Sequence, residues 1–153
     1  MPHYLSTDAL LATTRHKPHT GEWFEVAQQR IAAFADATDD HQWIHLHRAR
    51  AAAGPFGTTI AHGYLTLSLL PRLLHDAIEI DGLAMRINYG LDNVRLTNVV
   101  RADSRVRALS HIIASRRVPS GVRVEVDVTV EIEGSERPAL RATQILLLVE
   151  ETA

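Results

Sequence analysis

A carboxylate and an imidazole lie five residues apart in the segment Asp40-His41-Gln42-Trp43-Ile44-His45, which we expect to form a loop after a helix. Each group is a competent acid or base near neutral pH, so the two together could act on one water molecule. Gly63 follows in Ile60-Ala61-His62-Gly63-Tyr64 and begins an apolar segment that ends at Leu74. A backbone N–H at the start of such a helix could stabilise negative charge on a substrate oxygen, helped by the helix dipole.

Each of these residues also has a structural interpretation. Asp40 could cap the short helix that follows it. His45, taken alone, would more often be a partly buried structural histidine. For His62 we favour a structural hydrogen bond to the backbone over a role as the base. The spacing of Asp40, His45 and the glycine turn nevertheless favours catalysis.

Nearby histidines raise the question of a metal site. His41 and His45 are four residues apart, a spacing that suits zinc on a helix. The glutamate of the HExxH motif is absent, because Gln42 follows His41. We therefore expect no metal.

Composition limits the class of protein. The 153 residues are 46 % hydrophobic and 22 % charged, which predicts one globular domain over residues 1–153. A formal charge of −2 gives no electrostatic reason to expect nucleic-acid binding. The absence of cysteine excludes disulfides, thiolate zinc ligands and a cysteine nucleophile. Without a signal-peptide pattern or a long apolar run, we expect a cytoplasmic protein that does not enter a membrane.

The first half of the chain predicts helices. Ser6-Thr7-Asp8 can cap a helix over residues 9–12, and residues 22–26 predict a short strand. Further predicted helices are an amphipathic one that stops near residues 38–40, a short one over 45–53, and the apolar one over 64–74. Within the last, Pro71 should kink the helix or start a new turn.

The second half predicts strands, over residues 85–96, 105–118, 122–133 and 140–150. From Val122 to Ile132 apolar and polar residues alternate without a break, the pattern of a strand with one buried face. Short connections around residues 119–121 and 133–136 predict hairpins, and consecutive hairpins give an antiparallel meander. An apolar helix followed by such strands predicts an α+β domain whose sheet wraps around the helix.

These segments carry a resemblance to a known family. Asp40 to His45, and then Ile60 to Leu65, resemble the motif of the MaoC-like or (R)-specific enoyl-CoA hydratases. The resemblance continues weakly through residues 88–91 and 94–95. The broader family has glycine before the aspartate and Asn-Pro within the motif, where this chain has Asp39 and Gln42-Trp43. The Gln-Trp variant is similar to the branch that contains nodulation protein N-like dehydratases.

The resemblance implies a fold and an activity. Members have the hot-dog fold, a curved antiparallel sheet wrapped around a long central helix, and single-domain members form homodimers. They are hydro-lyases that add water to trans-2-enoyl thioesters of coenzyme A or acyl carrier protein, or remove it from (R)-3-hydroxyacyl thioesters. This chemistry of fatty acid metabolism needs no cofactor.

The resemblance also implies roles for residues of this chain. Asp40 and His45 would activate the water, and the N–H of Gly63 would bind the thioester oxygen. His62, Ser68 and Tyr89 would contact the substrate; some relatives carry a serine in the central helix, and Ser68 lies near that position. The candidates for binding the coenzyme A phosphates are Arg48, Arg50, Arg101, Arg116 and Arg117.

Two alternative functions stay open at this point. A hot-dog thioesterase would also bind acyl-CoA, but its water would attack the carbonyl carbon and release a free thiol. A non-catalytic subunit would bind acyl-CoA without turnover. The intact pair of Asp40 and His45 argues against the second alternative.

Overall fold

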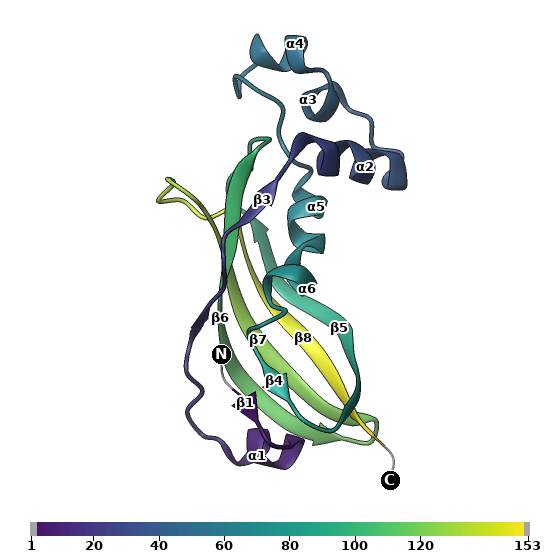
Figure 1. Ribbon diagram of the computed structural model, residues 1–153, viewed down its shortest axis with the longest axis vertical. Coiled ribbons are helices and arrows are strands. Elements are labelled where there is room, and N and C mark those ends of the chain that lie inside the picture. The colour runs from purple at the N-terminus through teal and green to yellow at the C-terminus, as the bar shows by residue number, and fades with distance from the viewer. Residues whose placement is uncertain (1–2, 152–153) are drawn as a thin grey trace.

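A curved antiparallel sheet dominates the computed structural model, which describes residues 3–151 (Figure 1). The sheet has six strands in the order β2-β6-β7-β8-β5, with β3 also pairing with β6. The strands are β2 (His19–Thr20), β3 (Phe24–Val26), β5 (Leu83–Leu96), β6 (Ser104–Val118), β7 (Gly121–Ile132) and β8 (Leu140–Glu150). The α+β fold expected from the sequence is therefore present.

Strand β7 shows how the sequence determines the two faces of the sheet. Its burial alternates along the whole strand, and the residues from Val122 to Val130 with even numbers are almost completely buried. These valines lie opposite Leu140, Ala142, Gln144, Leu146 and Leu148 of β8. The concave face of the sheet is thus apolar over most of its area, as the alternating pattern predicts.

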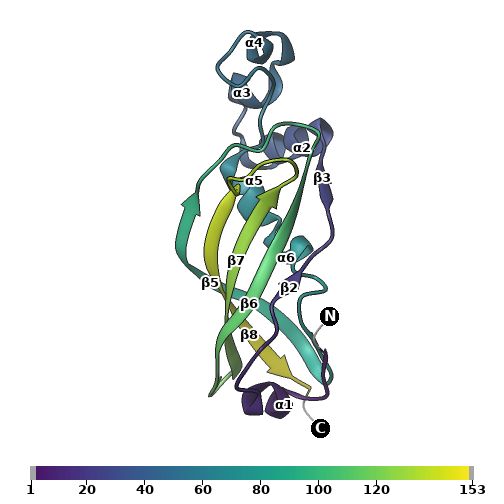
Figure 2. The same ribbon diagram turned by 90° about the vertical axis from the view of Figure 1, so that its left-hand side faces the viewer.

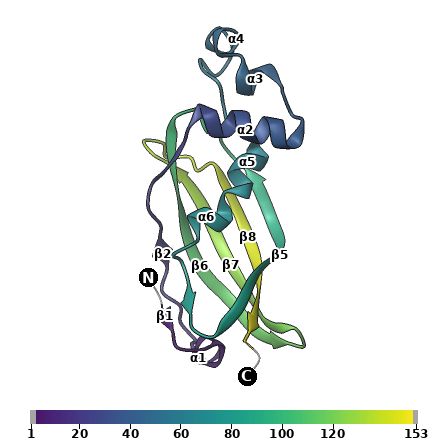
Figure 3. The ribbon, with the colours of Figure 1, turned by 45° about the vertical axis from the view of Figure 1, so that its right-hand side comes forward.

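The central helix lies against this concave face (Figure 3). It consists of α5 (Gly63–Ser68) and α6 (Leu70–Leu73), which meet at Leu69, and Pro71 lies in the first turn of α6. Proline is tolerated there because the first N–H groups of a helix have no intrahelical acceptor. The new turn predicted at Pro71 is therefore present. The leucines that pack into the core are Leu65, Leu69, Leu70, Leu73 and Leu74.

The order of the strands departs from a simple meander. Strands β6, β7 and β8 are joined by consecutive hairpins, but β5 pairs with β8, with Ile87 opposite Leu147. The prediction of a meander was wrong for β5, because local hairpin signals do not show which edge the first long strand joins. The other edge of β5 pairs with no strand among residues 3–151.

Three short helices form one end of the molecule (Figure 1). They are α2 (Gln28–Thr38), α3 (Trp43–Leu46) and α4 (Arg48–Ala52). Helix α2 stops at Asp39, which has a left-handed conformation with φ 57°, so the predicted end near residues 38–40 is confirmed. The single helix predicted over residues 45–53 is divided at His47, whose φ and ψ are not helical.

The opposite end holds the N-terminal elements and the end of β8 (Figure 2). Helix α1 (Thr7–Ala12) has Ser6 as its N-cap, since the Ser6 hydroxyl accepts a hydrogen bond from the Ala9 N–H. The parallel pair β1 (His3–Tyr4) and β4 (Glu79–Ile80) lies beside it. Among residues 3–151, no helix is long and apolar enough to cross a membrane.

Candidate active site

His45 is fixed in one orientation by the backbone. Its side chain belongs to α3 and is only 7 % exposed. Nδ1–H donates a hydrogen bond of 2.7 Å to the carbonyl of Ile60, whose own N–H donates to the carbonyl of Ile44. This pair of bonds links α3 to the segment that precedes α5. Because Nδ1 carries the proton, Nε2 is left as a free acceptor.

Burial lowers the pKa of His45 below 6.5, since the charged imidazolium loses its water. The hydrogen bond to Ile60 raises this pKa, the neighbouring His62 lowers it and the carboxylate of Asp40 raises it, each by less than burial lowers it. The net effect keeps His45 neutral at pH 7. A neutral imidazole with a free Nε2 can accept a proton.

His62 supports His45 from one side. The two imidazole rings stack with centroids 3.7 Å apart. The ring of Phe34, on α2, lies 5.1 Å from the ring of His62. Nε2–H of His62 donates a hydrogen bond of 2.9 Å to the backbone carbonyl of Asp40. His62 thus forms a backbone hydrogen bond of the kind expected from the sequence, and it holds the loop after α2 against the start of α5.

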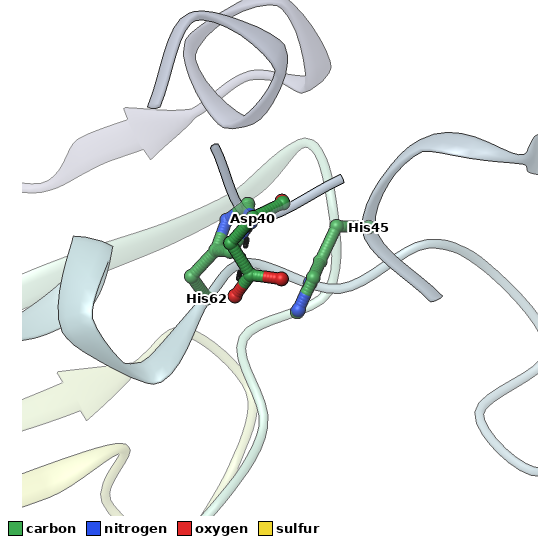
Figure 4. A group of neighbouring side chains, drawn as sticks. All are labelled: Asp40, His45 and His62. Carbon is green, nitrogen blue, oxygen red and sulfur yellow. Dashed lines mark hydrogen bonds and ion pairs between the residues drawn. The ribbon is translucent and has the colours of Figure 1, made fainter. Parts of the chain in front are cut away.

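Asp40 brings its carboxylate to the two rings (Figure 4). Its side chain is 53 % exposed, and Oδ2 lies 3.9 Å from Nε2 of His62. A carboxylate oxygen and one nitrogen of each imidazole all lie within 4.8 Å of one another. One water molecule can bridge groups at such separations. The structure therefore brings Asp40, His45 and His62 together, although the chain separates His45 from His62 by a helix and a loop.

The same three side chains are of types that bind metals. His62, however, already uses Nε2–H as a donor to the Asp40 carbonyl, and a nitrogen that carries a proton is not a ligand. His41, the other candidate ligand, forms an ion pair of 2.9 Å with Asp36 at the surface. His41 therefore lies outside the group formed by Asp40, His45 and His62.

Gly63 lies at the N-terminus of α5, directly after His62. A Cβ atom at this position would lie 2.5 Å from Cδ1 of Leu96, so a larger residue requires Leu96 to move. Among the backbone hydrogen bonds of the described residues, the Gly63 N–H has no acceptor outside the helix. It is one of the unpaired donors at a helix start, where a substrate oxygen can bind.

A cleft of about 650 Å³ opens beside these groups. His45 and Gly63 line it, together with Leu96 at the end of β5 and apolar side chains such as Phe56 and Val100. Arg101 and Arg137 also line the cleft. Neither arginine forms an ion pair with a carboxylate among residues 3–151, so both guanidinium groups are available to an anionic ligand.

Two predicted substrate contacts lie outside this cleft. Ser68 is at the last turn of α5 and lines a second, smaller cavity between the central helix and strands β5 and β8. Tyr89 is 66 % exposed and lies with Leu147 and Arg123 on the convex side of β5 and β8. The structure does not bring Tyr89 to His45.

The arginines predicted to bind phosphate are also dispersed. Arg117 pairs with Asp8 and Glu150 at the far end of the molecule, and Arg50 stacks on the ring of Trp43. Of the five candidates, Arg101 lines the cleft. Sequence reasoning missed Arg137, which the loop between β7 and β8 brings to the cleft, because no local pattern distinguishes it from other surface arginines.

Comparison with known proteins agrees with this fold and motif. The family model described as "MaoC like domain" matches residues 10–133. The chain is 48 % identical over 141 residues to 3-hydroxyacyl-thioester dehydratase Z of Mycobacterium tuberculosis, covering 92 % of this chain and 93 % of that protein. It is 47 % identical over 130 residues to nodulation protein N of Rhizobium leguminosarum bv. viciae, covering 83 % of this chain and 81 % of that protein.

A solved structure supports the same fold. The (R)-hydratase from A. caviae involved in PHA biosynthesis superimposes with a TM-score of 0.72 at 21 % identity, over 90 % of this chain and 98 % of that chain. At this identity the likeness shows the fold alone, and it confirms the hot-dog architecture expected from the sequence. The family model spans most of the chain, and two relatives are identical to it at nearly half of the aligned positions. The chain therefore belongs to the MaoC-like family.

Proposed function

We propose that this protein is an (R)-specific enoyl-thioester hydratase, or in the reverse direction a 3-hydroxyacyl-thioester dehydratase. The observation that carries the proposal is a neutral, buried His45 with a free Nε2 beside the exposed carboxylate of Asp40. His45 lines one cleft together with Gly63, whose N–H lies at the N-terminus of α5. The name of the relative in Mycobacterium tuberculosis, 3-hydroxyacyl-thioester dehydratase Z, supports this reaction class.

The two catalytic side chains have different tasks. Asp40 accepts a hydrogen bond from the water and orients it. Nε2 of His45 removes one proton as the water oxygen forms a bond to C3 of the enoyl thioester. His45 then returns that proton to C2 from the same side, so water adds in the syn sense and neither residue is consumed.

Negative charge develops on the thioester oxygen while the C3–O bond forms. The unpaired N–H of Gly63 donates a hydrogen bond to this oxygen, and the adjoining turn of α5 contributes its dipole. Loss of one such donor costs about 3 kcal/mol of transition-state stabilisation in well-studied enzymes. The close approach of Leu96 to Gly63 leaves room for the oxygen but for no larger side chain.

Arg101 and Arg137 give the cleft a positive end. We assign the phosphate groups of the thioester carrier to this end, because guanidinium groups match phosphate geometry. Coenzyme A and the prosthetic group of acyl carrier protein both carry phosphate, so either carrier fits this part of the cleft.

The proposal includes a homodimer of single-domain chains in the cytoplasm. Strand β5 spans 14 residues, and its outer edge is unpaired among residues 3–151. Exposed apolar side chains lie along it, namely Met85, Ile87, Tyr89 and Leu91. A long apolar edge of this kind favours pairing with another strand. A second copy of β5 would extend the sheet and cover these side chains.

The test is the loss of enoyl-thioester absorbance when the protein is mixed with crotonyl-CoA, with chiral analysis of the product. We expect (R)-3-hydroxybutyryl-CoA and no free thiol. Release of thiol in a parallel trapping assay would instead identify a thioesterase. Binding of acyl-CoA without either reaction would identify a non-catalytic binding protein.

The dimer is tested separately by analytical ultracentrifugation. We expect the wild-type protein to sediment as a dimer, and Ile87→Lys to shift it toward the monomer, because the charge would be buried without a partner. Arg95→Lys, on the same strand but without a change of charge, serves as the control. A monomeric wild-type protein would contradict this part of the proposal.

A further inference from the structure

One polar side chain interrupts the apolar concave face of the sheet. Gln144 of β8 lies between Val126 of β7 and Leu91 of β5 in the strand register. The other inward positions of this part of β8, from Leu140 to Leu148, are all apolar. Gln144 is only 4 % exposed. A glutamine in this position is not explained by packing, because an apolar side chain would fill the space without burying an amide.

The amide of Gln144 has an unused hydrogen-bonding capacity. Its Nε2 donates a hydrogen bond of 2.8 Å to Oδ1 of Asn88 on β5. Its Oε1 is buried and has no partner among the described residues. Buried polar atoms in native proteins are almost always paired, so this oxygen marks a place where a donor binds.

A cavity adjoins this amide pair. Its volume is about 330 Å³, and it lies between the central helix and strands β5 and β8. Leu67, Ser68 and Pro71 line it from the helix side, and Asn88, Leu91 and Gln144 from the strand side. No charged side chain lines it. The cavity is therefore apolar at its walls, with a hydroxyl and two amides at defined points.

The cavity lies along the helix that begins at Gly63. Ser68 follows Gly63 by five residues within α5, which places it about 7.5 Å further along the helix axis at the usual rise per residue. If the thioester oxygen binds at Gly63, as in the function proposed above, an acyl chain that runs alongside α5 extends toward this cavity.

We propose that this cavity binds the distal part of the acyl chain and that the preferred substrates carry a hydroxyl group there. A hydroxyl can donate to Oε1 of Gln144 and accept from a neighbouring amide or hydroxyl, so it satisfies the pair in either orientation of the amide. A fully apolar chain leaves Oε1 unpaired. A carboxylate or ammonium group finds no opposite charge in the cavity. The inference rests on the proposed hydratase function and names its substrate class.

The experiment compares trans-2-enoyl-CoA thioesters of six to eight carbons with the same chains hydroxylated at the terminal carbon. In the wild-type protein we expect kcat/KM to be higher for one hydroxylated chain than for its plain counterpart, by about tenfold or more. Gln144→Met removes the amide and keeps an unbranched side chain of similar length. It should reverse the preference by raising kcat/KM for the plain chain and lowering it for the hydroxylated one.

Thr143→Val is the matched control, because Thr143 is the adjacent residue on the convex face, where it bonds to Asp127. This variant should keep the wild-type preference. A wild-type protein that turns over plain chains as well as hydroxylated ones at all three lengths, or better, would overturn the inference and assign Oε1 to an ordered water.

Calorimetry with saturated thioesters separates this inference from the proposed reaction. Terminally hydroxylated acyl-CoA should bind the wild-type protein about tenfold more tightly than plain acyl-CoA of the same length, and Gln144→Met should abolish the difference. Loss of turnover on every enoyl thioester, with this binding preference intact, would refute the reaction and leave the cavity's specificity standing. Equal binding of both chains would refute the specificity.

Discussion

The two ends of the molecule use polar groups in opposite ways. At the end formed by α2, α3 and the start of α5, polar groups are left available: Nε2 of His45, the Gly63 N–H and the half-exposed Asp40 carboxylate. At the other end Arg117 binds both Asp8 and Glu150, and Glu150 also accepts a hydrogen bond from Thr7. One end holds groups ready for a ligand, whereas the other joins α1 to β6 and β8.

This difference separates activity from stability. Groups with free hydrogen-bonding capacity gain most when a substrate arrives, so their removal should reduce catalysis and affect folding little. Groups that are already paired contribute to the folded state and not to the reaction. Substitutions at the two ends should therefore change different observables, and each prediction below tests that separation.

The largest effect is expected from removing the acid–base pair. Asp40→Asn and His45→Gln should each lower kcat/KM for crotonyl-CoA by about 10³-fold, because each removes one partner of the water. The exposed Asp40 variant should keep the wild-type melting temperature. Asp39→Asn and His41→Gln, at neighbouring exposed positions, are the controls and should stay active. Full activity of Asp40→Asn would exclude the proposed mechanism.

The far end should show the largest effect on stability at Gly121, where β7 begins. This residue has φ 138°, and a Cβ atom would lie 2.0 Å from the carbonyl oxygen of Leu148. Gly121→Ala should therefore lower the free energy of unfolding by about 3 kcal/mol, measured by urea denaturation. Gly134→Ala is the matched control, since Gly134 also has positive φ but open space around it. Similar losses in both variants would show that φ, and not the contact with Leu148, sets the cost.

At the active end, Gly63→Val tests space and not the loss of a donor, because valine keeps the backbone N–H. The side chain would meet Leu96 and fill the place of the substrate oxygen, so kcat/KM should fall by about 10²-fold. Gly63→Ala should have a smaller effect, and adding Leu96→Ala to it should recover part of the activity. No recovery in the double variant would show that Leu96 is not the group that restricts position 63.

Protonation of His45 should cause the fall of kcat/KM at low pH. Its pKa lies below 6.5 because of burial, so kcat/KM should fall only when the pH drops below that value. The sign for stability follows from the same shift: between the folded and unfolded pKa values the unfolded chain binds more protons, so stability decreases as the pH falls below 6.5. Titration of the His45 ring by NMR measures the pKa, with His45→Gln to assign the signal. A value above 6.5 would contradict the burial argument.

Local patterns predicted most of the secondary structure. Alternation in Val122 to Ile132 gave both the strand and its buried face, and Ser6, Asp39 and Pro71 act where their backbone preferences predict. The pairing of β5 with β8 was not predictable in this way, because it joins residues far apart in the chain. Only the family resemblance predicted how the long strands assemble, because it implied the hot-dog fold.

The site was predictable to a similar extent. The motif pointed to Asp40, His45 and His62, which the fold brings together, and to Gly63, which directly follows His62 at the start of α5. Tyr89 lies away from His45, at a bulge between Asn88 and Gly90 where the register of β5 against β8 shifts, and no local pattern predicts such a bulge. Arg137 reaches the cleft only through the tertiary fold, so its sequence context carries no signal.

The smallest effect is expected at the paired end. Arg117→Ala should lower the melting temperature slightly and leave kcat/KM unchanged, because exposed ion pairs contribute little and are screened by salt. Arg117 lowers the pKa of Glu150, so the contribution of this pair is present above about pH 4.5 and is lost as the pH falls through the folded-state pKa. The difference between Arg117→Ala and wild type in thermal denaturation should therefore shrink both at pH 3 and at high salt. Arg116→Ala, the adjacent residue, is the control. If Arg117→Ala instead impaired catalysis, the two ends would be coupled, and the coupling would have to pass along β6, the strand that carries Arg117.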